Sequence, residues 1–220
     1  MSILITVPSP LEFEKLHINN IPNIQYLVSG VGNLATFAAI SNYFFHHPKI
    51  DLIVQVGVAG SFEKSSQIGD VLFVQQDVQA DLGKMHPTKG WIDIFDFGFD
   101  LGFPAFYTSP FLENPYLQDF QNLKLPVKKA VTVQQRHTDS RILERLSVTY
   151  QAQICSMEGF AVHFFGHLHK IPFIQMRAIS NDVSEIELNK THIEHSLQQL
   201  KLTLHQFISC YHDYSTNNKN

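Results

Sequence analysis

The sequence is short of the features that mark secreted, membrane-spanning and metal-binding proteins. Its 220 residues include only two cysteines, Cys155 and Cys210, which cannot form a disulfide framework, and neither CxxC nor HExxH occurs. No run of about 18 or more apolar residues is present, so no membrane-spanning helix is expected. The first residues carry no basic flank and no small-residue cleavage site, which argues against a secretory signal. We therefore expect a cytoplasmic protein.

Charge is also scarce. Charged residues make up 16% of the chain, the net charge is −4 and no basic tract occurs, so nucleic acid is not expected as a partner. Hydrophobic residues make up 44% of the chain, which excludes intrinsic disorder as a description of the whole. What remains is a globular protein with a small-molecule or protein partner.

Strand-like apolar runs alternate with helix-like segments over most of the chain. Strands are predicted at residues 2–7, 24–29, 51–56, 71–76, 127–133 and 171–179, and helices at 10–17, 34–46, 157–170 and 190–211. The strand-like runs are almost continuously apolar, as in a sheet that helices cover on both faces. This pattern predicts an α/β domain with a largely parallel or mixed sheet.

The segment 190–211 has the clearest helical period. Its apolar residues recur at spacings of four and three, which places them on one face of a helix: Ile193, Leu197, Leu200, Leu204, Phe207 and Tyr211. An earlier helix follows Gly30-Val31-Gly32, with Asn33 as its expected N-cap. We expect a single domain over residues 1–214, followed by a polar, disordered tail at 215–220.

Residues 84–122 break the alternation. They are rich in Phe, Gly and Pro and show no clear period, while their aromatic content argues against disorder. We expect an ordered excursion that covers a pocket or forms a subunit interface. An extension of the core is the simpler alternative.

Four polar clusters follow predicted strands, where α/β proteins collect their ligand-binding residues. Glu12 lies just after the first strand, where an acidic residue in the first turn of a helix also interacts favourably with the helix dipole. The small residues of Gly57-Val58-Ala59-Gly60 allow the backbone to approach a ligand closely. Any tight turn at the end of a strand would explain these glycines equally well.

The other two clusters lie later in the chain. Met157-Glu158-Gly159 opens a predicted helix, so Glu158 is either a capping group or a carboxylate that accepts two hydrogen bonds from the vicinal diol of a ribose. Arg177 and Asn181 close the last predicted strand, whose two-residue period places them on one face and Asp182 on the other. The alternative for Asn181 and Asp182 is the N-cap of a helix.

In this order, and with Ile68-Gly69-Asp70, the clusters resemble the nucleoside phosphorylase and nucleosidase superfamily. The general layout is similar to the methylthioadenosine/S-adenosylhomocysteine nucleosidases. A closer similarity, to futalosine hydrolases of the menaquinone pathway, lies in residues 56–62, 81–83, 91–96, 156–159 and 172–181. The resemblance extends from residue 1 to about residue 182. It implies a three-layer α/β sandwich in which helices flank a central, twisted, mixed and largely parallel sheet.

The resemblance also implies an activity, the hydrolysis of the N-ribosidic bond of a purine nucleoside by water, with no metal and no other cofactor. Glu12 would be the base that positions and deprotonates the water. Arg177 would orient that water or stabilise Glu12. Glu158 would bind the ribose 2′- and 3′-hydroxyls, with Met157 packed beneath the sugar.

The remaining site residues are implied in the same way. Val58, Ala59 and Gly60 would line the substrate pocket, and Asn181 would bind the purine. Methylthioadenosine nucleosidases carry Asp at the position of Asn181. An amide can accept a hydrogen bond from a protonated N7 while its NH2 group donates to a 6-oxo group. We therefore expect a hypoxanthine-type base, as in futalosine or inosine.

Several residues depart from the family pattern. Val58 stands where methylthioadenosine nucleosidases have a Ser whose hydroxyl contacts the attacking water, and residues 182–188 differ from the futalosine hydrolase pattern. Arg136, His137 and the loop 95–111 are candidates to hold the benzoate on the 5′ side of futalosine. The alternatives to a hydrolase are a nucleoside phosphorylase, with phosphate at Gly30-Val31-Gly32, and a purine-binding protein without catalysis.

The chain has twelve histidines, of which His163 and His167 have a spacing that suits two metal ligands on one helix. No acidic or cysteine partner accompanies them, so histidines on a helix surface are the simpler interpretation. The resemblance further implies a homodimer or a larger homo-oligomer.

Overall fold

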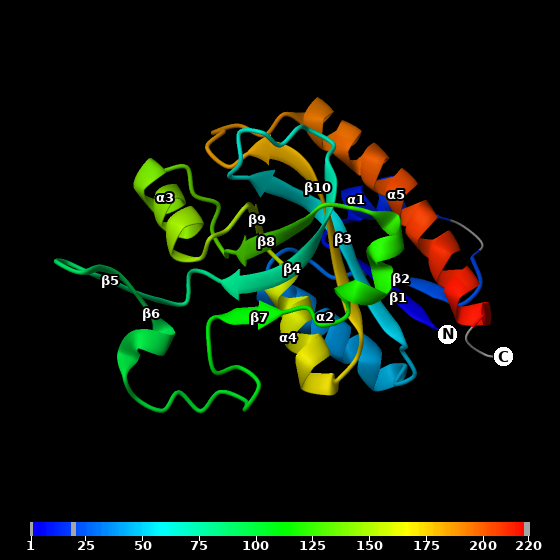
Figure 1. The fold of residues 1–220 in the computed structure, drawn as a ribbon, viewed down its shortest axis with the longest axis horizontal. Coiled ribbons are helices and arrows are strands. Elements are labelled where there is room, and N and C mark those ends of the chain that lie inside the picture. Colours follow the sequence, from blue (N-terminus) through cyan, green and yellow to red (C-terminus); the bar gives the residue numbers. More distant parts are fainter. Residues whose placement is uncertain (1, 19–20, 218–220) are drawn as a thin grey trace.

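The computed structural model describes residues 2–18 and 21–217 as an α/β fold (Figure 1). The strands are β1 (Ile3–Val7), β2 (Ile24–Val28), β3 (Leu52–Ser61), β4 (Val71–Gln79), β5 (Gly83–His86), β6 (Gly90–Asp93), β7 (Phe111–Glu113), β8 (Val127–Thr132), β9 (Ile154–Ser156) and β10 (Phe173–Asp182). The helices are α1 (Pro10–Leu16), α2 (Asn33–His46), α3 (Ser140–Thr149), α4 (Gly159–His169) and α5 (Lys190–Asn217), with short 3₁₀ helices η1 (Ile94–Phe97) and η2 (Leu117–Leu123).

The central sheet is mixed and largely parallel, as expected. Strands β2, β1, β3 and β10 pair in parallel, and β10 also pairs antiparallel with β4. From β4 the sheet continues in parallel through β8 and β9, and β9 returns antiparallel to β3. The strands β3, β10, β4, β8 and β9 thus form a closed ring, and the carboxyl ends of β3 and β10 lie side by side.

Helices cover both faces of the sheet because its strands are apolar on both faces. In β1, Ile3 and Ile5 belong to a core that includes Leu200 and Leu204 of α5, whereas Leu4 packs with residues of α2 and α4. The predicted apolar stripe of the last helix is the face of α5 that contacts the sheet. The expected three-layer sandwich is therefore confirmed.

Several element boundaries differ from the prediction, among them those of β3, β10 and α2. Strands β3 and β10 continue to Ser61 and Asp182, because the two segments pair with each other beyond the apolar runs. Helix α2 begins at Asn33, so the expected N-cap at Asn33 is wrong: Gly32 holds the cap position without a side-chain bond, and Asn33 Oδ1 instead accepts a hydrogen bond from the Ala161 amide.

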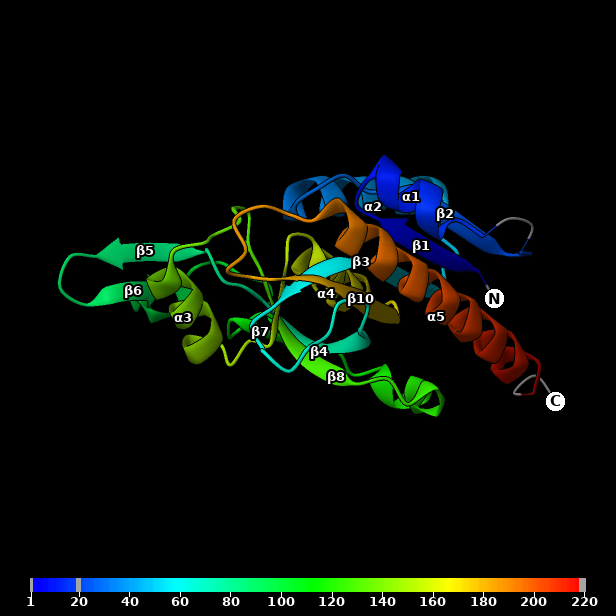
Figure 2. The ribbon, with the colours of Figure 1, turned by 90° about the horizontal axis from the view of Figure 1, so that it is seen from above.

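The segment 84–122 contains a hairpin that the sequence pattern did not indicate. Strands β5 and β6 extend away from the sheet beside α3 (Figure 2). The hairpin is attached there by Trp91, whose indole donates a hydrogen bond to the Tyr150 hydroxyl at 3.0 Å and lies against the Arg145 guanidinium. Later in the segment, Tyr107 and Leu112 are buried against Phe160 of α4.

The expected single domain over residues 1–214 and disordered tail at 215–220 stay predictions. Helix α5 continues through residues 215–217, past the expected boundary, and residues 218–220 lie outside the described part of the chain. None of the described helices is both long and apolar enough to cross a membrane.

The packing of α5 on the sheet makes a testable prediction. Replacing the fully buried Leu204 with Ala should lower the free energy of unfolding by about 2–5 kcal/mol, because it leaves a cavity in the core beneath α5. Leu202 of the same helix is 57% exposed, and Leu202→Ala should change stability by about 0.5 kcal/mol or less. Urea unfolding of both variants measures the difference, and equal losses would contradict this packing.

Candidate active site

A cavity of about 270 Å³ opens at the carboxyl ends of β3 and β10. It is lined by seven of the eight predicted site residues: Glu12, Val58, Ala59, Gly60, Met157, Glu158 and Asn181. These residues come together because β3 and β10 run in parallel, while α1 and the start of α4 reach the same edge of the sheet. The eighth, Arg177, is fully buried behind the cavity.

Glu12 is held at the N-terminus of α1. The Ser9 side chain caps this helix by accepting from the Glu12 amide, and its hydroxyl donates to Glu12 Oε2 at 2.7 Å. Glu12 Oε1 accepts from the Val58 amide at 3.3 Å. Burial raises the pKa of Glu12, although the Ser9 hydrogen bond and the charge of Arg177 act in the opposite direction.

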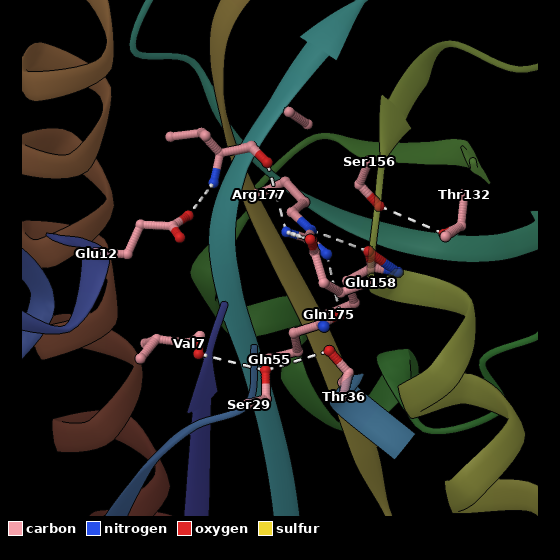
Figure 3. A network of polar contacts seen from close by, with 12 residues as sticks. Val7, Glu12, Ser29, Thr36, Gln55, Thr132, Ser156, Glu158, Gln175 and Arg177 are labelled. Carbon is pink, nitrogen blue, oxygen red and sulfur yellow. Dashed lines mark hydrogen bonds and ion pairs between the residues drawn. The ribbon is translucent and has the colours of Figure 1, made fainter. Parts of the chain in front are cut away.

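Glu158 reaches the cavity from the opposite side (Figure 3). It occupies the N-cap position of α4, but its side chain makes no capping bond, so the capping alternative is wrong. Instead Glu158 Oε1 accepts from the Gly32 amide at 3.2 Å, and Oε2 lies 3.5 Å from Arg177 Nη1. The Glu158 carboxylate therefore forms an ion pair with Arg177 and accepts a hydrogen bond from a backbone amide.

Arg177 is the largest fully buried side chain among the described residues. Its Nε donates to Gln175 Oε1 and its Nη2 to Gln55 Oε1, each at 3.1 Å. Its Nη1 points to the cavity, 3.4 Å from the Val58 carbonyl oxygen and 3.5 Å from Glu158. The guanidinium is thus held by polar groups of β3 and β10 and presents one nitrogen to the carboxylates.

Asn181 faces the cavity, but not through the period that the sequence suggested. The pairing of β10 with β3 shifts by one residue between Ile179 and Asn181, so Asn181 lies opposite Gly60 while Arg177 lies opposite Gly57. The expectation that Arg177 and Asn181 share a face is wrong because Ser180 is an extra residue in the strand. Asp182 makes a turn with Ser184, and no helix begins there.

A second layer of polar residues behind Arg177 was not predicted. Gln175, Asp77, Thr132 and His163 are all fully buried. Burial raises the pKa of Asp77 to about 7 and lowers the pKa of His163 to about 3. The interpretation of His163 as a surface histidine is therefore wrong. In the described part of the chain, no three or more His, Cys, Asp or Glu residues cluster as metal ligands would.

The outer rim of the cavity includes Arg136 and His137, two of the candidates for a 5′ substituent. The Arg136 guanidinium donates to the carbonyl oxygens of Glu185 and Ile186, which connects the two loops beside the cavity. No residue of 84–122 lines this cavity, so within one chain the loop 95–111 is not placed to hold a 5′ substituent there. Other residues of the segment, among them Tyr116 and Phe120, line separate cavities. Four aromatic residues of the segment, Phe95, Phe103, Phe106 and Tyr107, pack on α4 instead. The role of the segment in a subunit interface stays a prediction.

A model of the phosphorylase superfamily matches residues 5–209, nearly the whole chain. The chain belongs to the phosphorylase superfamily. The resemblance that the four clusters carried is thereby confirmed.

Curated relatives within the superfamily are nucleosidases. The chain is 25% identical over 165 residues to the 5′-methylthioadenosine/S-adenosylhomocysteine nucleosidase of a Shewanella species (strain MR-7), a match that covers 71% of this chain and 65% of the relative. It is 28% identical over 136 residues to the aminodeoxyfutalosine nucleosidase of Campylobacter jejuni, covering 59% of this chain and 55% of the relative. The chain thus spans about two thirds or less of the length of the curated relatives it matches.

Solved structures in the superfamily share the fold. A futalosine hydrolase mutant of Helicobacter pylori superposes with a TM-score of 0.75 at 21% identity, covering 94% of this chain and 98% of that one. The expectation of a nucleoside phosphorylase-like fold is confirmed.

The crowding at Gly57 makes a prediction for the superfamily site in this chain. A Cβ atom at this position would lie 2.8 Å from Arg177 Nη1 and 2.9 Å from Glu12 Oε1. Gly57→Ala should therefore force both side chains apart and lower the free energy of unfolding by about 1–3 kcal/mol. Chemical denaturation measures this loss. Unchanged stability would show that Glu12 and Arg177 do not meet beside this glycine.

Proposed function

We propose that this chain is a nucleosidase that hydrolyses the N-ribosidic bond of a purine nucleoside. The observation that carries the proposal is the placement of Glu12 and Glu158 in one cavity, in different surroundings. Glu158 is served by a cation and an amide, whereas burial raises the pKa of Glu12. Two carboxylates with different environments suit two different roles in one reaction.

Glu12 is the proposed general base. It would take a proton from a water molecule while the water oxygen bonds to C1′ and the C1′–N9 bond breaks, leaving its electron pair on the purine. This step resembles inverting glycoside hydrolysis, in which a carboxylate activates the water on the face opposite the leaving group. Val58 has no hydroxyl to assist the water, but its amide holds Glu12 in place.

Glu158 is the proposed acceptor for the ribose 2′- and 3′-hydroxyls. A carboxylate has about four lone-pair sites, and Gly32 and Arg177 each approach only one oxygen, which leaves acceptor capacity for a diol. Arg177 places a positive charge beside Glu158. Met157 would pack beneath the sugar, and residues 58–60 would form the wall of the pocket.

Asn181 supports a 6-oxopurine as the base. Its Oδ1 accepts from the Ser180 hydroxyl at 2.9 Å, and its Nδ2 donates to the Asp182 carbonyl oxygen at 2.7 Å. A flipped amide would turn its oxygen toward that carbonyl, so the two contacts fix the orientation. One acceptor site and one N–H remain, which suit a protonated N7 and a 6-oxo group. We therefore propose futalosine, with release of hypoxanthine, as the substrate.

A methylthioadenosine/S-adenosylhomocysteine nucleosidase is the second candidate. It is favoured by the Shewanella relative, whose match is the longer of the two curated ones described above. Its base carries a 6-amino group, which would face the remaining N–H of Asn181 as donor against donor. An unsatisfied pair of this kind costs about 1–3 kcal/mol for each buried group.

Water is the proposed nucleophile rather than phosphate. The Gly32 amide, which could bind phosphate at the start of α2, donates to Glu158 instead. A phosphate here would also lie close to that carboxylate and be repelled by it. The homo-oligomeric state and the cytoplasmic location stay predictions.

The base specificity is tested by incubating the protein with futalosine, inosine and methylthioadenosine, with and without phosphate, and identifying the released base. We expect hypoxanthine from futalosine, independent of phosphate. Asn181→Asp should shift the ratio of kcat/KM toward the 6-aminopurine by about tenfold or more, because a carboxyl group can accept from the amino group. Faster release of adenine than of hypoxanthine by the unaltered protein would contradict the 6-oxopurine assignment.

The raised pKa of Glu12 leads to a prediction about how activity and stability depend on pH. The base acts only when ionised, so kcat/KM should fall as the pH drops through a pKa above the ordinary glutamate value of about 4.3. The same raised pKa means that ionised Glu12 destabilises the fold, so its contribution to stability declines as the pH rises through this window.

Glu12→Gln separates the two effects. It should lower kcat by about 10²–10⁴-fold and raise the melting temperature at pH 8, where the glutamate is ionised. The measurements are pH–rate profiles and thermal melts of both proteins. A kcat/KM that stays flat down to the ordinary glutamate pKa would rule out Glu12 as the base.

A further inference from the structure

A path of buried, hydrogen-bonded side chains leads from behind the cavity along β10 to β4. Arg177 Nε donates to Gln175 Oε1 at 3.1 Å, and Gln175 Nε2 donates to Asp77 Oδ2 at 2.8 Å. All three side chains are fully buried. Part of this hydrogen-bonded path is visible in Figure 3, where Gln175 lies beside the Arg177 guanidinium. Asp77 is thus the charged end of a path that supports Arg177.

Asp77 accepts from three donors and also reaches the second carboxylate. Its Oδ1 accepts from the Val78 amide and the Thr132 hydroxyl, each at 2.8 Å. The Thr132 oxygen in turn accepts from the Phe160 amide at 2.9 Å, in the first turn of α4. Glu158 is the N-cap residue of that helix. One aspartate therefore supports Arg177 through Gln175 and the backbone beside Glu158 through Thr132.

His163 fixes the orientation of the Gln175 amide. Its Nδ1 lies 3.0 Å from the Leu112 carbonyl oxygen, so Nδ1 carries the proton and Nε2 is an acceptor. Gln175 Nε2 lies 3.3 Å from that acceptor. With both N–H groups directed at Asp77 and His163, the Gln175 oxygen must face Arg177.

Gly159 explains why the network can lie so close to the site. A Cβ atom at Gly159 would lie 2.2 Å from both Asp77 Oδ2 and Gln175 Oε1. The residue after Glu158 therefore rests directly on the Asp77–Gln175 pair, and only a glycine fits there. The position of Glu158 is coupled to this pair by contact as well as by hydrogen bonds.

We propose that Asp77 is a positioning residue for ribose recognition, acting through Gln175 on Arg177 and through Thr132 on the segment that carries Glu158. This rests on the proposed nucleosidase function. Asp77 does not line the cavity and touches no substrate. Its loss should weaken the binding of the sugar while leaving the binding of the base, which involves Asn181, unchanged.

The test is Asp77→Asn, assayed at pH 8 with futalosine as substrate and free hypoxanthine as inhibitor. The amide cannot accept from Gln175, Val78 and Thr132 together, so the Gln175–Arg177 contact is disturbed. We expect KM for the nucleoside to rise about 10- to 100-fold, as for a displacement of about 1 Å at the ribose. The inhibition constant of hypoxanthine, which has no ribose, should change less than about twofold.

The double variant Asp77→Asn/Gln175→Glu is the rescue. A carboxylate at 175 accepts from Arg177 Nε and from the new amide at 77, so both contacts are remade and the net charge is restored, while the bond between 77 and 175 runs in the reverse direction. His163 Nε2, which is an acceptor, loses its contact with the Gln175 amide in this variant. We expect KM to return to within about threefold of the unaltered protein. The matched control is Asp93→Asn, because Asp93 is also buried and hydrogen-bonded, to Tyr150, but does not line the cavity.

The outcomes distinguish the two proposals. If the unaltered protein cleaves neither futalosine nor methylthioadenosine, the proposed function is wrong. If it cleaves only methylthioadenosine, the same assay is run with that nucleoside and adenine. If it is active but Asp77→Asn leaves KM unchanged, weakens nucleoside and base equally, or is not rescued, the positioning role alone is wrong. If Asp77→Asn does not fold, the double variant tests the positioning role instead. A double variant that folds and binds the nucleoside supports the role, and one that folds without binding it contradicts the role.

Discussion

The full burial of one guanidinium is the constraint on which the site depends. A buried cation is stable only when each donor finds an acceptor and a negative charge lies near. Arg177 meets this requirement with two glutamine side chains, a carbonyl oxygen and Glu158. Gly57 is small enough to let Glu12 approach the same cation. The residue types around Arg177 therefore follow from the acceptors and the negative charge that its buried guanidinium requires.

The two cavity carboxylates differ because they meet this cation differently. Glu158 lies within ion-pair distance of Arg177 and accepts from an amide at the start of α2. Glu12 receives only a hydroxyl and an amide as direct donors, and burial outweighs the distant charge. The fold thus separates a carboxylate suited to hold hydroxyls from one suited to take up a proton. No difference in residue type is needed for this division.

The sequence predicts the elements that have a regular apolar pattern and the polar residues that lie at strand ends. The stripe of α5, the strands near β1 and β3, and seven cavity residues follow from apolar runs and the polar clusters behind them. The bulge at Ser180 does not, because an extra residue leaves no mark in a sequence pattern. Gln175 and Asp77 were missed because a polar residue inside an apolar strand resembles an exposed position. Helix α4 covers both, since Gly159 rests on the pair and His163 lies beside Gln175.

The buried polar residues beside the site carry a cost for stability. Asp77 of β4, Gln175 and Arg177 of β10 and His163 of α4 are all fully buried. Ionised groups in this position oppose folding, as the raised pKa of Asp77 indicates. The two cores beneath α5 and between α2 and α4 must offset that cost. Stability in this chain is therefore supplied by the apolar cores, including the one that the five ring strands share, while the buried polar residues hold the site.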